Sequence, residues 1–258
     1  MSGGAPPGPE ATSAALRARS LGKRYGSFPA LDRIDLEIPA GQFVLLLGPN
    51  GAGKSTLLRL FATLIRPTSG EVLIHGAPAA GEEAAGLRRR IGLLSHHTFL
   101  YDHLTGRENL LFYARLYGLP DPGRAARDAL RAVGLEERSE DLVRTYSRGM
   151  QQRLAIARAS LHAPDILLLD EPFTGLDREA TDRLQDNLRR AREARRTCVM
   201  ATHDFAAGVP LADRVVILRA GRVALDRAAA GLDAAAVETL FRNTTRPVAE
   251  GVERSWTT

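Results

Sequence analysis

A glycine-rich segment at residues 48–56 has the residue types and the spacing needed to bind a phosphate chain. It follows an apolar run, 43–47, and precedes leucines at helical spacing, so a strand, a loop and a helix are expected in that order. Glycines let backbone N–H groups approach a phosphate without a Cβ in the way, and the helix N-terminus adds partial positive charge. The segment consists of Gly48, Pro49, Asn50, Gly51, Ala52, Gly53, Lys54, Ser55 and Thr56.

Two side chains of this segment have separate expected roles. Lys54 is expected to reach the β- and γ-phosphates of a nucleotide, and the Ser55 hydroxyl to bind Mg²⁺. A chance glycine turn is the alternative, but a strand before the loop and a helix after it favour the phosphate site. The segment therefore predicts binding of a nucleoside triphosphate.

A second apolar run, 166–169, ends in two carboxylates, Asp170 and Glu171. Buried strands often end in an acid that caps the next helix, so the pair by itself does not indicate catalysis. The phosphate loop upstream favours a catalytic role for it. Asp170 is expected to bind Mg²⁺, and Glu171 to orient and deprotonate an attacking water. Together with Lys54, these residues predict ATP hydrolysis.

The elements that position these residues indicate an α/β fold. A mainly parallel sheet is expected from five apolar runs, and alternating patterns at 16–21 and 34–38 predict an antiparallel β subdomain. Three helices between about residues 95 and 162, the first opened by the capping pair Thr105 and Glu108, predict an inserted helical subdomain. The five runs are 43–47, 91–94, 166–169, 197–201 and 214–218.

Composition limits the classes of protein to consider. The 258 residues carry a net charge of +5, but arginines alternate with acids, which favours a solvated surface over a nucleic-acid partner. Cys198 is the only cysteine, so an internal disulfide is excluded. No apolar run is long enough to span a bilayer. We expect a loose tail at 1–14, one domain at 15–242 and a polar tail at 243–258.

The motifs together resemble the ATP-binding subunit of an ABC transporter. The resemblance covers roughly residues 15–225 and adds three motifs to the phosphate loop and the acid pair; they are 146–153, 175–177 and 201–204. It implies an ABC-type P-loop NTPase that binds ATP and Mg²⁺. It also implies a homodimer with a second ATPase subunit and separate membrane-spanning permease subunits, with this chain peripheral on the cytoplasmic face of the inner membrane.

The resemblance implies further site residues. Tyr25 matches the aromatic residue that stacks on adenine; a surface turn tyrosine is the alternative. Ser147 and Gly149 match positions that touch the γ-phosphate of the other subunit in a head-to-tail dimer. Asp177 matches a loop linking the two sites, a role compatible with capping the next helix. His203 matches a catalytic histidine at the γ-phosphate, the alternative being a structural histidine.

Three residues depart from the family pattern. Arg148 replaces a glycine and Met150 a glutamine, a form closer to exporters than to importers. For Arg148 an outward ion pair in the helical subdomain is expected, and added positive charge near the opposing phosphate is the alternative. His96 aligns with a glutamine that coordinates Mg²⁺, so we expect His96 to accept a hydrogen bond from a Mg²⁺-bound water. A transition-metal or haem-iron site with His97 and His103 is the alternative.

Within the family, these motifs resemble the haem-exporter ATPase of bacterial cytochrome c maturation. ATP binding would then close the dimer and hydrolysis would reset it. The alternatives are the ATPase of a multidrug or sodium exporter and, from another class, a soluble ABC ATPase of translation or DNA repair. A permease helix is expected to dock near residues 96–104. Nothing in the sequence identifies the cargo.

Overall fold

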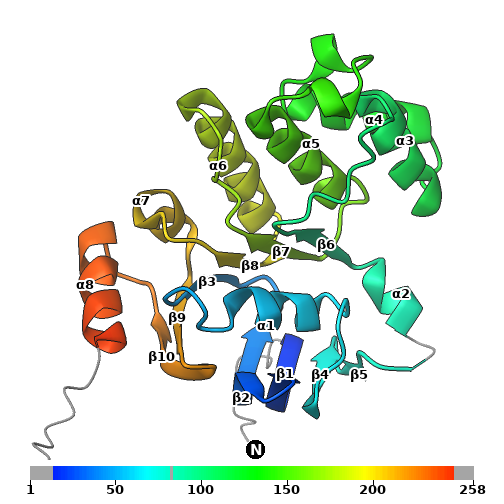
Figure 1. Ribbon diagram of the computed structural model, residues 1–258. Coiled ribbons are helices and arrows are strands. Elements are labelled where there is room, and N and C mark those ends of the chain that lie inside the picture. Colours follow the sequence, from blue (N-terminus) through cyan, green and yellow to red (C-terminus); the bar gives the residue numbers. More distant parts are fainter. Residues whose placement is uncertain (1–13, 82–83, 247–258) are drawn as a thin grey trace, which may run out of the picture.

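The computed structural model describes residues 14–81 and 84–246, which form two sheets with helices packed around them (Figure 1). Of the tails predicted at 1–14 and 243–258, residues 1–13 and 247–258 lie outside the described residues, whereas 243–245 belong to a helix. Ala14 is already paired with Pro39 at the start of the first strand, so the first expected boundary is one residue too late. The last helix continues to Thr245, because Arg219 donates to the Thr244 carbonyl and holds its final turn.

The larger sheet is parallel except at one edge. Its strand order is β10-β9-β3-β8-β7-β6, and only β10 runs antiparallel to its neighbour. The strands are β3 (Phe43–Leu47), β6 (Ile91–Leu94), β7 (Ile166–Asp170), β8 (Thr197–Ala201), β9 (Arg214–Arg219) and β10 (Arg222–Ala228). The five predicted strands are all present, whereas β10 was not predicted because most of its residues are exposed and charged or small.

The smaller sheet is antiparallel, in the order β2-β1-β4-β5. Its strands are β1 (Ala14–Tyr25), β2 (Phe28–Pro39), β4 (Ser69–Ile74) and β5 (Ala77–Pro78). The hairpin between β1 and β2 turns at Gly26, whose φ of 58° suits glycine, and it places Tyr25 opposite Phe28. Both predicted strands of this subdomain lie inside longer ones, so the expected α/β fold with an antiparallel part is confirmed.

Helices cover both faces of the parallel sheet, and three of them stand together beyond β6 (Figure 1). The helices are α1 (Lys54–Phe61), α2 (Ala84–Arg88), α3 (Gly106–Leu116), α4 (Pro122–Ala132), α5 (Arg148–Ser160), α6 (Arg178–Glu193), α7 (Phe205–Gly208) and α8 (Ala234–Thr245). The capping box forms as predicted, with Thr105 accepting from the Glu108 N–H and Glu108 from the Thr105 N–H. We call α3, α4 and α5 the helical lobe.

The parallel sheet separates two apolar cores, because successive side chains of a strand point to opposite faces. Phe43, Leu45 and Leu47 of β3 belong to the core shared with the helical lobe and α6. Val44 and Leu46 belong to the core shared with α1 and the antiparallel sheet. All five side chains are almost fully buried, so the strand that leads into the phosphate loop is rigidly held.

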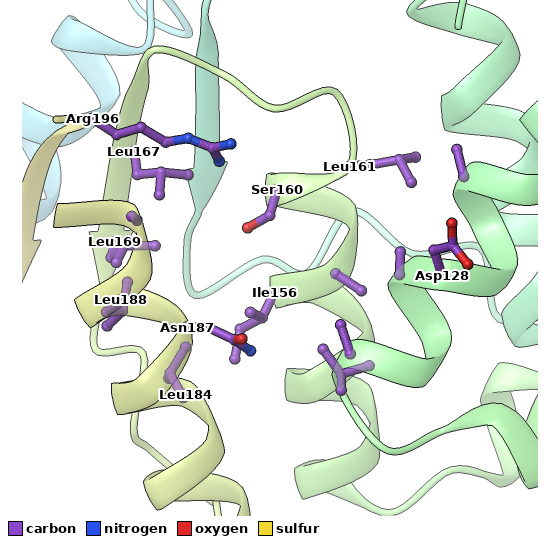
Figure 2. Close-up of a pocket in the computed structure, with 16 residues that line it drawn as sticks. Asp128, Ile156, Ser160, Leu161, Leu167, Leu169, Leu184, Asn187, Leu188 and Arg196 are labelled. Atoms are coloured by element: carbon purple, nitrogen blue, oxygen red, sulfur yellow. The ribbon is translucent and has the colours of Figure 1, made fainter. Parts of the chain in front are cut away.

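An apolar cavity of about 350 Å³ lies between α6 and the helical lobe. Figure 2 shows Ile156, Leu167 and Leu184 around it, with Asp128 on the side of α4 and Arg196 next to the sheet. None of the predicted site residues lines this cavity. Among the described residues, no helix is both long and apolar enough to cross a membrane.

Candidate functional site

The phosphate loop joins the carboxyl end of β3 to the amino end of α1, as predicted. Gly53 precedes α1 with a φ of 103°, and a Cβ at this position would lie 2.7 Å from the Ala30 carbonyl oxygen. A Cβ at Gly48 would lie 2.6 Å from the Leu218 carbonyl oxygen. Both positions therefore need glycine for packing against backbone, in addition to any need to approach a phosphate.

Lys54 begins α1, and its ammonium group bends back over the loop. It donates to the carbonyl oxygens of Gly48 (2.5 Å) and Pro49 (3.2 Å). Burial lowers the pKa of Lys54, while the nearby carboxylates of Glu171 and Asp170 oppose that shift. The ammonium is thus held by two neutral acceptors, and a phosphate anion would be a stronger one.

A cavity of about 330 Å³ adjoins the loop and is lined by residues 50–56, Tyr25, Phe28, Asp170 and Glu171. Tyr25 and Phe28 are unusually exposed for aromatic residues, at 46% and 58%. The Lys23 ammonium lies 5.3 Å from the Tyr25 ring centroid. Sequence reasoning singled out Tyr25 but missed Phe28; the signal was its place directly opposite Tyr25 across a two-residue turn.

Asp170 and Glu171 differ in environment although they are adjacent. Asp170, the last residue of β7, is buried, and this burial raises its pKa, an effect opposed by the Ser55 hydroxyl and the Lys54 ammonium. Glu171 has a φ of 51°, a strained value for a residue with a side chain, and its N–H donates to the Ala201 carbonyl at 2.8 Å. The kink turns Glu171 away from the line of the strand.

Glu171 meets His203, a residue 32 positions further along the chain. His203 Nδ1 lies 2.9 Å from Glu171 Oε2. Because a carboxylate can only accept, Nδ1 carries the hydrogen in this pair. From α5, Gln152 donates to the carbonyl oxygens of Glu171 (3.4 Å) and Pro172 (3.1 Å) and so braces the same turn. The structure therefore brings Lys54, Asp170, Glu171 and His203 together.

A second cavity, of about 600 Å³, shares three residues with the first: Ser55, Asp170 and Glu171. His96 and Arg148 line it from the side of the helical lobe. The exposed His96 side chain thus faces the same space as the two predicted Mg²⁺ ligands. Within residues 14–81 and 84–246, no group of three or more His, Cys, Asp or Glu side chains is arranged to hold a metal ion.

Arg148 does not make the ion pair expected for it with any described residue, which corrects that expectation. Its side chain instead lies over Gly175, where a Cβ would be 3.6 Å from Arg148 Cγ. Gly175 has a φ of 78° and exposes only backbone to the arginine. The guanidinium group therefore faces the second cavity and not an acid of the helical lobe.

Six predicted residues line neither cavity, and they are Gly48, Pro49, Ser147, Gly149, Asp177 and His203. Ser147 caps α5 by accepting from the Met150 N–H at 3.3 Å, and Asp177 caps α6 by accepting from the Ala180 N–H at 2.8 Å. The structural role weighed for Asp177 is therefore present. Gly149 packs against the Gly175 carbonyl, only 2.7 Å from where its Cβ would be, so the two helix starts are held close together.

Comparison with known proteins places this geometry in a family context. The sequence model described as "ABC transporter" matches residues 31–174. The chain is 40% identical over 204 residues to the sulfate/thiosulfate import ATP-binding protein CysA of Mycobacterium tuberculosis, covering 78% of this chain and 58% of that protein. It is 39% identical over 203 residues to the daunorubicin resistance ATP-binding protein DrrA3 of Streptomyces coeruleorubidus, covering 78% and 64%.

Solved structures show the same fold. The ATP-binding cassette MJ0796, in a dimeric post-hydrolysis state bound to ADP and Pi, superposes with a TM-score of 0.78 at 29% identity; the match covers 84% of this chain and all of that one. The chain spans 58% and 64% of the length of the two relatives above.

Proposed function

Because the chain belongs to the ABC transporter family and carries its ATP-binding domain, we propose that it binds and hydrolyses ATP to power a membrane transporter. One observation carries this proposal: two cavities meet at Ser55, Asp170 and Glu171, one along the phosphate loop and one facing His96. The place where they meet is the place where a terminal phosphate must lie if the phosphate chain follows residues 50–56.

The residues present fit Mg²⁺. A hydroxyl and a carboxylate, Ser55 and Asp170, face one space, and oxygen donors are the ligands this cation prefers. We propose that these two residues hold Mg²⁺ and that His96 accepts a hydrogen bond from one of its waters. When bound, Mg²⁺ neutralises charge on the phosphate oxygens.

In the proposed reaction, Lys54 leaves the carbonyls of Gly48 and Pro49 and binds the β- and γ-phosphates. Glu171 takes a proton from a water whose oxygen attacks the γ-phosphorus, and the bond to the β–γ bridging oxygen breaks. His203 donates to Glu171 through Nδ1 and so fixes the carboxylate's direction. Tyr25 and Phe28 provide the surface for the base.

The first test separates binding from turnover. Lys54→Ala is expected to lose ATP binding, whereas Glu171→Gln should keep binding and lose roughly 10²- to 10⁴-fold in kcat, because only the proton acceptor is removed. ATP titration and steady-state phosphate release measure the two effects. Glu179→Gln, an exposed acid in the first turn of α6, is the matched control. Near-parental turnover by Glu171→Gln would contradict the role given to this carboxylate.

The docking site proposed for a permease lies on the helical lobe. The segment 96–104 and the helix α3 expose large apolar side chains, and monomeric proteins seldom gather such residues without a partner. They are Phe99, Tyr101, Phe112 and Leu116; Leu64, which follows α1, is also exposed and lines a hollow together with Phe99. We propose that a helix of a membrane-spanning subunit covers them, with this chain peripheral on the cytoplasmic face of the membrane and paired with a second copy of itself.

For the cargo, we propose haem export in cytochrome c maturation. The sequence resemblance supports this proposal, and it depends on His96 and on residues 147–150 of the motif 146–153. Drug export is the second candidate, supported by the similarity to DrrA3. Deleting the gene in its source organism and staining for covalently bound haem distinguishes them. Loss of c-type cytochromes is expected; unchanged cytochromes together with new daunorubicin sensitivity would favour the second candidate.

A further inference from the structure

Arg158, in the last turns of α5, is a buried cation that the proposed reaction does not use. It is only 5% exposed, and no carboxylate pairs with it among the residues that the structure describes. A buried charge is costly unless hydrogen bonds compensate it. Arg158 must therefore gain its compensation from something other than an ion pair, and its partners show what it holds.

Those partners lie on the loop 95–100 and on the two elements beside it, β6 and α3. Arg158 Nη2 donates to the Leu93 carbonyl at 2.6 Å, and Nε donates to the Thr98 carbonyl at 3.1 Å. The guanidinium carbon also lies 5.4 Å from the ring centroids of both Phe99 and Tyr113. A planar, charged fork between two aromatic rings is a geometry that arginine provides and lysine does not.

The loop held in this way, residues 95–100, has no regular secondary structure and carries His96. Its other anchors are few: the Ser95 hydroxyl donates to the His97 carbonyl at 2.8 Å, and the Tyr113 hydroxyl donates to the Phe99 carbonyl. Phe99 itself has a φ of 56°, an unfavourable conformation for a residue with a side chain. The loop therefore depends on contacts from α3 and α5 for its shape.

We propose that Arg158 is a positioning residue that fixes the loop 95–100, so that His96 faces Ser55 and Asp170 while Phe99 is presented on the docking surface. This assignment rests on the function proposed above, because that proposal gives His96 its role beside Mg²⁺ and gives the docking surface its membrane partner. Arg158 lies eleven residues after Ser147 on one continuous helix, about 16 Å along its axis. The helix α5 thus connects Ser147, the residue that caps its start, to the loop 95–100.

The test uses the full chain with three variants. Arg158→Met keeps the length of the side chain without its charge, and Arg158→Lys keeps the charge without the fork. Arg153→Met is the matched control, because Arg153 lies on the same helix but donates to the carbonyls of Val133 and Gly134 inside the helical lobe. Amide exchange of β3 and β7 reports in each case that the core remains folded.

Two measurements are made on each protein: amide exchange of residues 94–101, and ATPase rate as a function of Mg²⁺ concentration. Arg158→Met is expected to raise loop exchange by roughly 10- to 100-fold, because the charge-assisted hydrogen bonds to the carbonyls of Leu93, just before the loop, and of Thr98, within it, are lost. It should also raise the Mg²⁺ concentration for half-maximal rate by at least about threefold. Arg158→Lys should give smaller changes in both, and Arg153→Met should give neither.

The outcomes are distinguishable. Unchanged loop exchange in Arg158→Met would overturn the proposal directly. Faster loop exchange with an unaltered Mg²⁺ dependence would also overturn it, because Arg158 would then be structural only. If the parent protein binds no ATP, the function proposed above fails, while the exchange result still decides whether Arg158 holds the loop.

Discussion

At the scale of single residues, the adjacent carboxylates of Asp170 and Glu171 differ in burial and in their hydrogen-bond partners. Asp170 is buried and close to Ser55, which suits a metal ligand. Glu171 leaves the strand with a positive φ and meets His203, which suits a proton acceptor. Because burial raises the pKa of Asp170, its charged form is destabilised in the free protein, and a bound cation would relieve that cost.

The exposed pair Tyr25 and Phe28 leads to the second prediction. Tyr25→Ala and Phe28→Ala should each raise the Kd for ATP by roughly 5- to 100-fold, since stacking of a base on an aromatic ring contributes about 1–3 kcal/mol. Binding of inorganic tripolyphosphate, which has no base, should change by less than about twofold. Calorimetric titration with both ligands measures the difference.

Phe112→Ala is the control for this prediction, since Phe112 is similarly exposed but lies on α3 in the helical lobe. If Phe28→Ala loses as much affinity for tripolyphosphate as for ATP, Phe28 shapes the phosphate loop and does not contact the base.

At the scale of elements, α5 contacts several separate parts of the site. Ser147 caps its start, Gln152 braces the Glu171 turn, and Arg158 donates to the carbonyls of Leu93 and Thr98 on either side of His96. Just beyond its end, His162 stacks on Tyr117 with ring centroids 3.8 Å apart. A single rigid helix therefore carries contacts to the site, the helical lobe and the edge of the sheet.

His162 leads to the third prediction, which concerns pH. Its Nε2 lies 3.3 Å from the Ile91 carbonyl, its Nδ1 is buried without a hydrogen-bond partner among the described residues, and burial lowers its pKa from 6.5 to about 4. The fold thus favours the neutral ring. This contribution to stability is complete above pH 6.5 and is lost as the pH falls towards and through 4.

We expect the parent to lose roughly 1–3 kcal/mol of unfolding free energy from this group between pH 7 and 4, a value reduced for partial exposure. His162→Phe keeps the stacking and should remove that part of the acid sensitivity. Urea unfolding at both pH values measures it, with the exposed His103 changed to Gln as control. If the free energy of unfolding of His162→Phe falls between pH 7 and 4 by as much as that of the parent, His162 is not the source of this acid sensitivity.

At the scale of the whole molecule, the sheet order assembles the site. In the larger sheet β8 lies between β3 and β7 (Figure 1), so the residues that follow these three parallel strands meet at one edge. The phosphate loop follows β3, Glu171 follows β7 and His203 follows β8. Ser147 and Gly149 instead lie at the start of α5 and outside both cavities, which is compatible with the proposal that they serve the site of a second copy.

This separation leads to the fourth prediction. ATP with Mg²⁺ should convert the Glu171→Gln protein from monomer to dimer, because on the proposed function a partner supplies Ser147 and Gly149 to each γ-phosphate. Adding Ser147→Asp should abolish the dimer: aspartate still caps the helix but repels the phosphate. Sedimentation velocity measures the oligomeric state of each protein.

Ser160→Asp, at the other end of α5 and also exposed, is the control and should still dimerise. A Glu171→Gln protein that stays monomeric at saturating ATP would argue against shared sites.

The sequence alone determined those parts of the protein that depend on neighbours along the chain. Three such local patterns are the phosphate loop, the capping box at Thr105 and the strand ending in Asp170. Each depends on the conformation or on the pattern of apolar residues within a few neighbouring positions. They sufficed to predict the fold class and a nucleotide site.

Only the tertiary structure decided the rest, since it depends on which distant segments pack together. The insertion of β8 between β3 and β7 puts His203 on Glu171, and the packing of α5 against the end of β6 buries Arg158 beneath the loop of His96. It also leaves Arg148 over Gly175 without the expected ion pair. Side-chain partners across such distances are chosen by the packing of both cores, and no periodicity in the chain encodes them.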